Sequence, residues 1–198
     1  MITSTLSHPN LASTPRKRRI TVAEFERMIA ANVWPEDERI ELIQGELIDM
    51  SPINARHVYA VNALTEIFIR RLANRAWVSS QNPVQLTEEL RPQPDVALVR
   101  PPARRYRQQL PAPADVLLLV EVCDTTLAYD RDEKLPLYAR AGIPEVWLVD
   151  LNANTISVYR EPRHGAYAQL TTVGREAEIA PGEFPEVKVK VDDIVGVE

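Results

Sequence analysis

The sequence predicts a protein of the α/β or α+β class, in which helices flank a mixed β-sheet. Helical and strand-like patterns alternate along the chain instead of separating into blocks. The aliphatic runs 116–122 and 146–149 are also joined by a segment with a helical pattern, 130–140. Such a strand–helix–strand unit is normally a right-handed parallel crossover, so at least one parallel strand pair is expected.

Three elements are expected in the first part of the chain. Residues 21–31 have the pattern of a short helix that begins with a capping box formed by Thr21 and Glu24. Two strands are expected within 39–50, joined by a tight turn at Gln44–Gly45. Apolar side chains then recur every three or four residues over 56–74, which predicts the longest helix.

The second part of the chain is expected to supply most of the sheet. The segment 100–113 should be a loop, because its prolines exclude a continuous strand. The helix 130–140 should begin at Asp130 and end at Gly142, with Pro144 just beyond. The chain after about residue 181 is expected to be irregular. The predicted strands are 77–80, 84–86, 95–99, 116–122, 145–150, 155–160 and 167–173.

Length and composition indicate one domain over residues 20–198, preceded by a disordered tail over 1–19. The tail ends in four basic residues, 16–19. It is either a solvated segment or a basic arm that contacts phosphate groups.

The overall charge is ordinary for a globular protein. The 23 basic and 28 acidic residues give a net charge of -5, which indicates no strongly charged partner. The single cysteine, Cys123, has no partner within the chain, which suits a reducing compartment. No apolar run reaches the roughly 18 residues of a membrane span. We therefore expect a cytoplasmic protein without a membrane partner.

Two carboxylates and a lysine stand out against their surroundings. Glu121 lies within an aliphatic strand, and a buried carboxylate needs a partner, a proton or a metal ion. Asp95 opens another apolar strand, and Lys134 follows on the next helix. Together they could bind Mg²⁺ and stabilise charge on a phosphate. In the alternative interpretation, Glu121 pairs with an arginine and Lys134 is a solvated helix residue.

The chain resembles the Uma-type endonucleases, a branch of the PD-(D/E)XK nuclease superfamily. The resemblance covers about residues 20–195. It depends on the stretches 21–25, 39–46, 50–52, His57, 93–95, 120–122 and 129–147. It implies a restriction-endonuclease-like fold, hydrolysis of DNA phosphodiesters with Mg²⁺ or Mn²⁺, and a homodimer.

The resemblance also implies a role for individual residues. Asp95 and Glu121 would bind the metal, and Glu46 would be a further metal ligand or would hold water. The usual lysine of the superfamily lies two residues after the glutamate, where this chain has Cys123. Lys134 would replace it from the following helix. His57 would be accessory to the metal or phosphate.

Several of these assignments have structural alternatives. Glu46 is an exposed strand residue in the alternative interpretation, with Glu41 as the competing acidic residue, and His57 is then only a helix residue. Asp124 and Asp130 are interpreted as turn and helix-cap residues rather than metal ligands. Three arginines of one loop either contact phosphate or are merely solvated. These are Arg104, Arg105 and Arg107.

Three functions remain open at the level of sequence. The first is a metal-dependent DNA endonuclease. The second, suggested by Cys123 in the usual lysine position, is an inactive module on the same fold that binds nucleic acid or protein. The third is hydrolysis of another phosphate compound, although the chain has no glycine-rich phosphate loop.

Overall fold

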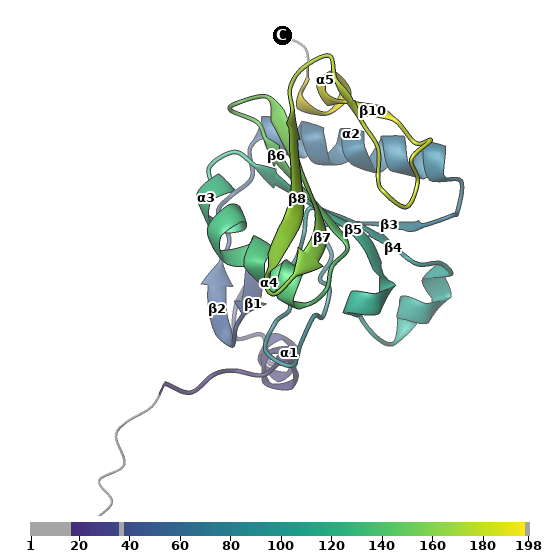
Figure 1. Cartoon of the computed structure of the whole chain (residues 1–198). Helices are drawn as coiled ribbons and strands as arrows, with labels where there is room; N and C mark the ends of the chain where they lie inside the picture. The colour runs from purple at the N-terminus through teal and green to yellow at the C-terminus, as the bar shows by residue number, and fades with distance from the viewer. Residues whose placement is uncertain (1–16, 36–37, 197–198) are drawn as a thin grey trace, which may run out of the picture.

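A six-stranded mixed sheet forms the centre of the molecule (Figure 1). A computed structural model of the chain describes residues 17–35 and 38–196. The strand order is β3-β4-β5-β6-β7-β8, and only β5 and β6 are parallel. The strands are β3 (Trp77–Ser80), β4 (Val96–Val99), β5 (Val116–Cys123), β6 (Glu145–Asp150), β7 (Thr155–Arg163) and β8 (Ala166–Val173). The predicted mixed sheet and its parallel pair are therefore confirmed.

The crossover between β5 and β6 is a helical segment in three parts. It consists of α3 (Leu127–Tyr129), a π-helical turn η3 (Asp130–Lys134) and α4 (Leu135–Arg140). The helical segment begins at Leu127, so the prediction of a start at Asp130 is wrong. It ends as predicted before Gly142, whose φ of 76° is the left-handed conformation that favours glycine.

The first helix and the hairpin are confirmed. In α1 (Val22–Ala30), the Glu24 N–H donates to the Thr21 hydroxyl at 3.3 Å, and the Thr21 N–H donates to the Glu24 carboxylate at 3.0 Å. Strands β1 (Ile40–Ile43) and β2 (Glu46–Asp49) pair separately from the main sheet. Backbone hydrogen bonds between Leu42 and Arg91 attach this hairpin to the segment that leads into β4.

Strand β5 is buried on both faces of the sheet. On one face, the long helix α2 (Ala55–Leu72), predicted over 56–74, packs Leu64 and Phe68 against residues such as Val120. On the other face, α4 contributes Tyr138 to a second apolar cluster (Figure 1). Burial on both faces explains why β5 is a continuous aliphatic run rather than an alternating one.

Two further predictions of secondary structure are wrong. Residues 84–86 form no strand, because the Val84 and Leu86 N–H groups donate to Pro92 and Leu90 in a local loop. The C-terminal segment is not entirely irregular. It contains β9 (Glu178–Ile179), β10 (Val189–Lys190) and α5 (Val191–Val195), which lies against α2. These elements are too short to produce a recognisable period in the sequence.

The remaining connections agree with the expectations. The proline-rich loop between β4 and β5 contains two 3₁₀ turns, η1 (Ala103–Arg107) and η2 (Pro113–Asp115), and no strand.

Residues 1–16 of the predicted tail lie outside the described residues. Within the described part of the chain, no helix is long and apolar enough to cross a membrane.

Candidate active site

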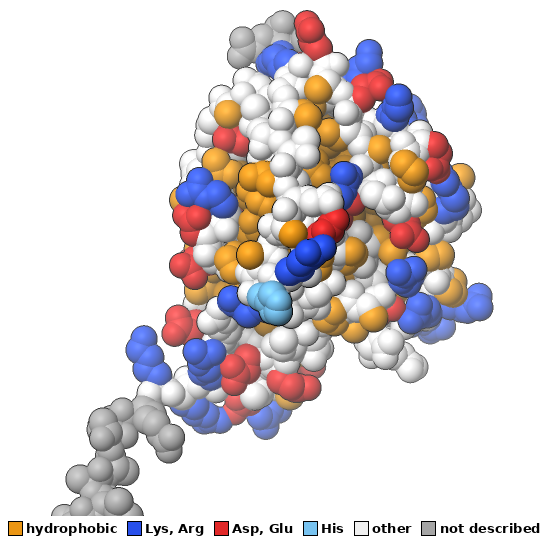
Figure 2. Space-filling view, viewed as in Figure 1, with side chains coloured by type: hydrophobic (Ala, Val, Ile, Leu, Met, Phe, Trp, Pro, Cys, Tyr) orange, Lys and Arg blue, Asp and Glu red, His pale blue; other side chains and the backbone are white. Residues whose placement is uncertain are grey.

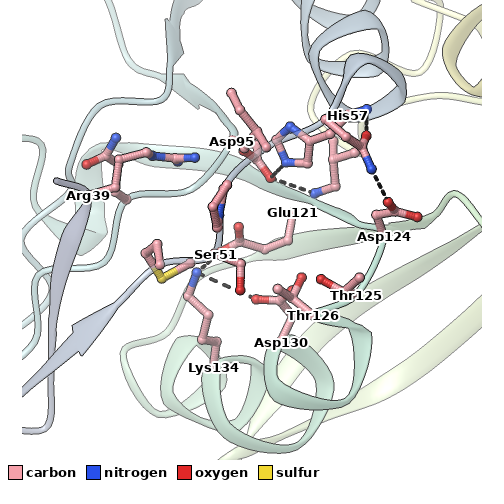
Figure 3. Close-up of a pocket in the computed structure, with 16 residues that line it drawn as sticks. Arg39, Ser51, His57, Asp95, Glu121, Asp124, Thr125, Thr126, Asp130 and Lys134 are labelled. Carbon is pink, nitrogen blue, oxygen red and sulfur yellow. Dashed lines mark hydrogen bonds and ion pairs between the residues drawn. The ribbon is translucent and has the colours of Figure 1, made fainter. Parts of the chain in front are cut away.

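Asp95 and Glu121 come together because β4 and β5 are antiparallel neighbours. Val96 is paired with Val120, so Asp95 and Glu121 lie beside each other where β4 begins and β5 approaches its end. The Val122 N–H donates to Asp95 Oδ2 at 2.8 Å and fixes this carboxylate. Both carboxylates line a cavity of about 80 Å³, here called the catalytic cavity (Figure 3).

Lys134 enters this cavity from the π-helical turn and is surrounded by carboxylates. Its Nζ lies 3.0 Å from Glu121 Oε1, 3.1 Å from Glu41 Oε1 and 3.6 Å from Asp130 Oδ1. The side chain is only 1% exposed. The interpretation of Lys134 as a solvated residue is therefore wrong, and so is the pairing of Glu121 with an arginine, since its cationic partner is Lys134.

The hairpin contributes Glu41 to this cluster, and Glu46 lies outside it. Glu41 faces the protein interior from β1, whereas the Glu46 side chain is 65% exposed and lies 4.0 Å from Lys17. The Gln93 N–H donates to Glu41 Oε1 at 2.8 Å. Glu41 Oε2 is buried and has no hydrogen-bond partner among the described residues. The structure thus brings Glu41, the competing acidic residue, to Lys134 and leaves Glu46 at the surface.

Asp130 belongs to the buried cluster and is not a helix cap. It lies within the helical segment, and its Oδ2 accepts a hydrogen bond from the Thr126 hydroxyl at 2.6 Å. Asp124 also lines the catalytic cavity, where it accepts a hydrogen bond from the Asn54 amide and lies 3.7 Å from Arg56.

His57 joins the site from the first turn of α2, as predicted. Asn54 caps this helix by accepting a hydrogen bond from the His57 N–H at 3.0 Å. The ring Nε2 of His57 lies 3.1 Å from Asp95 Oδ2, and Nδ1 is buried without a partner among the described residues. His57 therefore orients one of the two central carboxylates.

The three predicted loop arginines lie outside the catalytic cavity. Arg104, Arg105 and Arg107 are in η1, and none of them lines the cavity. Arg105 forms an ion pair of 2.8 Å with Asp115. The structure therefore does not bring these residues to the carboxylates.

Two residues that were not predicted from the sequence belong to the site, Arg39 and Tyr138. Arg39 lines the cavity, and its guanidinium extends toward the side on which Asp95 lies (Figure 3). Its spacing of two residues from Glu41 on a strand was the available signal. Tyr138 donates its hydroxyl to Glu121 Oε1 at 2.5 Å. It follows Lys134 by four residues, the spacing that places two side chains on one helix face.

The cluster holds more negative charge than one ammonium can neutralise. Burial raises the pKa of Glu121 to about 8; the Lys134 ammonium opposes this shift, and the carboxylates of Asp130, Asp95 and Glu41 increase it. Burial alone would lower the pKa of Lys134, but Glu121 and its other neighbours raise it well above its usual range. The site therefore favours an added positive charge.

Two other groups near the cluster are kept neutral. Burial, together with the Glu121 charge, raises the pKa of Tyr138 well above its usual range, so this hydroxyl remains a donor. Burial likewise raises the pKa of the Cys123 thiol, with a further contribution from Asp130. Cys123 therefore supplies no charge to the cluster.

The donor set suits a hard cation such as Mg²⁺. Among residues 17–35 and 38–196, no group of three or more His, Cys, Asp or Glu side chains is arranged to hold a metal ion. Mg²⁺, however, is usually bound by one or two carboxylates and keeps several waters. Asp95 and Glu121 offer that pair, and the buried Glu41 Oε2 has no hydrogen-bond partner in the described part of the chain. The residues therefore fit Mg²⁺ that is completed by water and phosphate oxygens.

Comparison with known proteins points to one family. The model of the Uma2 family, described as putative restriction endonuclease, matches residues 22–192. A crystal structure of a putative nuclease belonging to DUF820 from Anabaena variabilis superimposes with a TM-score of 0.69 at 15% identity. The match covers 89% of this chain and 97% of that chain, and it shows that the two share the restriction-endonuclease-like fold. No curated protein matches the chain.

Proposed function

The chain belongs to the Uma2 family of putative restriction endonucleases, and we propose that it hydrolyses DNA phosphodiester bonds with Mg²⁺ or Mn²⁺. The observation that carries this proposal is the buried Lys134 ammonium held between Glu121, Glu41 and Asp130 beside the catalytic cavity. It reproduces the carboxylate and lysine pattern of the superfamily with the lysine on a different element.

Asp95 and Glu121 would hold the metal ion, which would polarise the phosphate and activate a water molecule. His57 fixes Asp95, and Tyr138 fixes Glu121, each by one hydrogen bond. These contacts prevent the carboxylates from turning away from the cavity. Such positioning is the main contribution a protein makes to phosphoryl transfer.

Lys134 supplies the fixed positive charge of the site. In hydrolysis a water oxygen bonds to phosphorus and the P–O bond to the leaving oxygen breaks. The attacking water gives a proton to solvent, and the leaving oxygen takes one from solvent. Lys134 can orient the water or stabilise the charge that develops on the phosphate. Glu41 holds the ammonium at 3.1 Å. Arg39, at the mouth of the same cavity, is placed to contact a phosphate oxygen.

Nicking of supercoiled plasmid by the purified protein tests the proposal. Wild type should nick with Mg²⁺ or Mn²⁺ and not with EDTA, whereas Lys134→Ala and Glu121→Ala should lose activity. The proposal fails if the folded protein binds no divalent metal, or if both variants nick as well as wild type. DNA binding that is unaffected by EDTA, without cleavage under any metal, would favour the inactive binding module instead.

Glu41 and Glu46 provide a matched pair for the same assay. Glu41→Gln should reduce nicking by at least about tenfold, because it removes one carboxylate from the lysine cluster. Glu46→Gln should leave nicking unchanged, because its side chain is exposed. The reverse result would restore the assignment of Glu46 and exclude that of Glu41.

We further propose a homodimer that forms through β8. This strand is at the edge of the sheet, and its backbone and the 58% exposed Leu170 are open to a second copy. Light scattering at micromolar protein should give twice the chain mass. Leu170→Lys should give the monomer mass, whereas a monomeric wild type would exclude the dimer.

A further inference from the structure

A second cavity lies next to the catalytic cavity and shares two residues with it. It has a volume of about 320 Å³, and Arg39 and Gln93 line both cavities. The catalytic cavity, at about 80 Å³, has room for a metal ion and a few waters, since each water needs at least about 10–15 Å³. The larger neighbour has the size of a small-molecule site.

One wall of the second cavity is aromatic. Phe25 from α1 and Trp34 from the segment after it lie with ring centroids 5.8 Å apart at an angle of 59°. Phe25 is buried, whereas Trp34 is only partly buried and so keeps ring surface available. Aromatic rings of this kind are where single-stranded bases stack, because every base has a flat π-face.

The Arg91 side chain packs against the Phe25 ring and also lines the second cavity. The Arg91 guanidinium lies 5.2 Å from the centre of the Phe25 ring, and its Nε is buried without a hydrogen-bond partner among the described residues. Burial lowers the pKa of Arg91, and the nearby Glu26 only partly offsets this effect. The guanidinium can therefore stack with, or donate to, a planar polar ligand.

The rest of the lining is mixed: apolar residues such as Ile29 and Ile40 alternate with polar side chains that could bind the edge of a nucleobase. Asn32, Glu38 and Gln93 bring amide and carboxylate groups to the cavity. The Gln93 side-chain amide donates to the Gln81 carbonyl at 2.8 Å, which holds the side chain in place. A base offers both donors and acceptors at its edge, and this mixture of groups can satisfy both.

We propose that the second cavity, which we call the base cavity, binds one unstacked nucleobase of the DNA strand that is cut. Trp34 stacks on the base, Arg91 and the polar residues contact its edge, and Arg39 contacts the phosphate that joins it to the catalytic cavity. The inference rests on the proposed nuclease function and adds that the DNA is unpaired at the bound base. It implies a preference for single-stranded or locally unpaired DNA, because unstacking a paired base costs a few kcal/mol.

The test is a thermodynamic cycle that combines two changes: removal of the Trp34 side chain from the protein and removal of the bases from the DNA strand. Fluorescence anisotropy measures the binding of a labelled single strand and of an abasic strand of equal length, with Ca²⁺ in place of Mg²⁺. Trp34→Ala should weaken binding of the normal strand by about 5- to 150-fold, the effect of losing one stacked base. It should leave binding of the abasic strand unchanged, and Trp34→Phe should retain most of the affinity.

Trp77 provides the matched control. It is the other partly exposed tryptophan, it lies on β3, and it lines neither cavity. Trp77→Ala should leave binding of both strands unchanged. The proposed role of the base cavity would be overturned by either of two results. In the first, Trp34→Ala weakens binding of both strands by the same factor; in the second, it binds both strands as tightly as wild type.

The two proposals can fail separately. If wild type nicks plasmid but Trp34→Ala shows no loss that depends on bases, only the base cavity is excluded. If wild type binds neither strand and nicks no plasmid, the nuclease function and the base cavity are both excluded. Preferential binding of duplex over single strand would also contradict the inference.

Discussion

The buried Lys134 ammonium determines the charge balance of the candidate site. An ammonium that is 1% exposed would be strongly destabilising by itself, and here three carboxylates compensate it. The intact buried cluster contributes little to the free energy of unfolding. Removing one member lowers this free energy strongly, because it leaves a buried charge without a partner. A gain in stability therefore does not explain why the cluster is present.

Lys134→Met should destabilise the metal-free protein by about 3–5 kcal/mol, because it leaves buried carboxylates without their cation. Urea denaturation measures this change. Saturating Mg²⁺ should recover part of the loss, because the ion supplies positive charge to the same carboxylates.

Lys188→Met is the control for this variant. Lys188 is 67% exposed and lies 3.6 Å from Glu178 on the surface. Its replacement should change stability by no more than about 0.5 kcal/mol. Equal effects of the two substitutions would mean that Lys134 is not held by the buried cluster.

Metal affinity should increase with pH up to about 8. Burial raises the pKa of Glu121 to about 8, so below this pH the metal must displace a proton. Calorimetric titration should show the Mg²⁺ affinity falling roughly tenfold for each pH unit below that value if one proton is released. In Glu121→Gln the residual affinity should no longer follow this profile, and an unchanged profile would assign the proton to another group.

The same pKa has the opposite consequence for the stability of the metal-free fold. A carboxyl whose folded pKa lies above its usual 4.5 binds its proton more tightly in the folded state. Its contribution to stability is therefore present at low pH and is lost as pH rises from about 4.5 to 8. Metal binding reverses this loss at neutral and higher pH.

Separate elements each bring one part of the site. Asp95 directly precedes β4, Glu121 lies on β5, and the helical segment after β5 carries Lys134. The β1–β2 hairpin carries Glu41, and it is placed by backbone contacts with the segment before β4. The hairpin turn should therefore influence activity although it lies outside the catalytic cavity.

Gly45→Ala should test the role of that turn. Gly45 has a φ of 75°, and an added Cβ would lie 2.5 Å from the Arg19 Cβ. We expect a loss of more than about 1 kcal/mol in the free energy of unfolding, together with slower nicking as Glu41 shifts. Differential scanning calorimetry and the plasmid assay measure the two effects.

Gly174→Ala is the matched control for this change. Apart from its own chain neighbours, no atom of the described residues lies within 4 Å of the position of an added Cβ at Gly174. Stability and nicking should both stay close to wild type. A harmless Gly45→Ala would show that the hairpin tolerates movement without loss of function.

At the scale of the whole molecule, side chains of both charge signs are spread over the surface that Figure 2 shows, between apolar groups. With a net charge of -5, the chain as a whole repels DNA weakly. In the proposed nuclease, affinity for DNA would then come from local groups such as Arg39 and from a bound metal ion. Substrate binding by such a nuclease would depend strongly on metal.

Mg²⁺ should stabilise the whole fold by mass action. At a concentration one hundred times its Kd, an ion that binds only the folded state adds about 2.7 kcal/mol and raises the Tm. Asp95→Asn should abolish most of this increase. Asp193→Asn, which changes an exposed carboxylate on α5, should retain it. An increase that survives Asp95→Asn would place the ion elsewhere.

The sequence alone determined the elements whose signal is local. Period and capping residues identified α1, α2 and the hairpin, and an uninterrupted aliphatic run identified β5. Glu121 was recognisable because a carboxylate stood in that run. Lys134 was noted as the next lysine along the chain, and the resemblance gave it the role of the displaced lysine. The structure places it 3.0 Å from Glu121.

Only the tertiary structure decided between residues of equal local pattern. Glu41 and Glu46 are both strand carboxylates, and Glu41 joins the site because it meets Lys134, 93 residues away in the chain. Asp130 looked like a helix cap until the helix proved to begin earlier. Arg39 reaches the catalytic cavity because the hairpin docks beside β4. Such choices depend on packing between distant segments, and local periodicity contains no information about that packing.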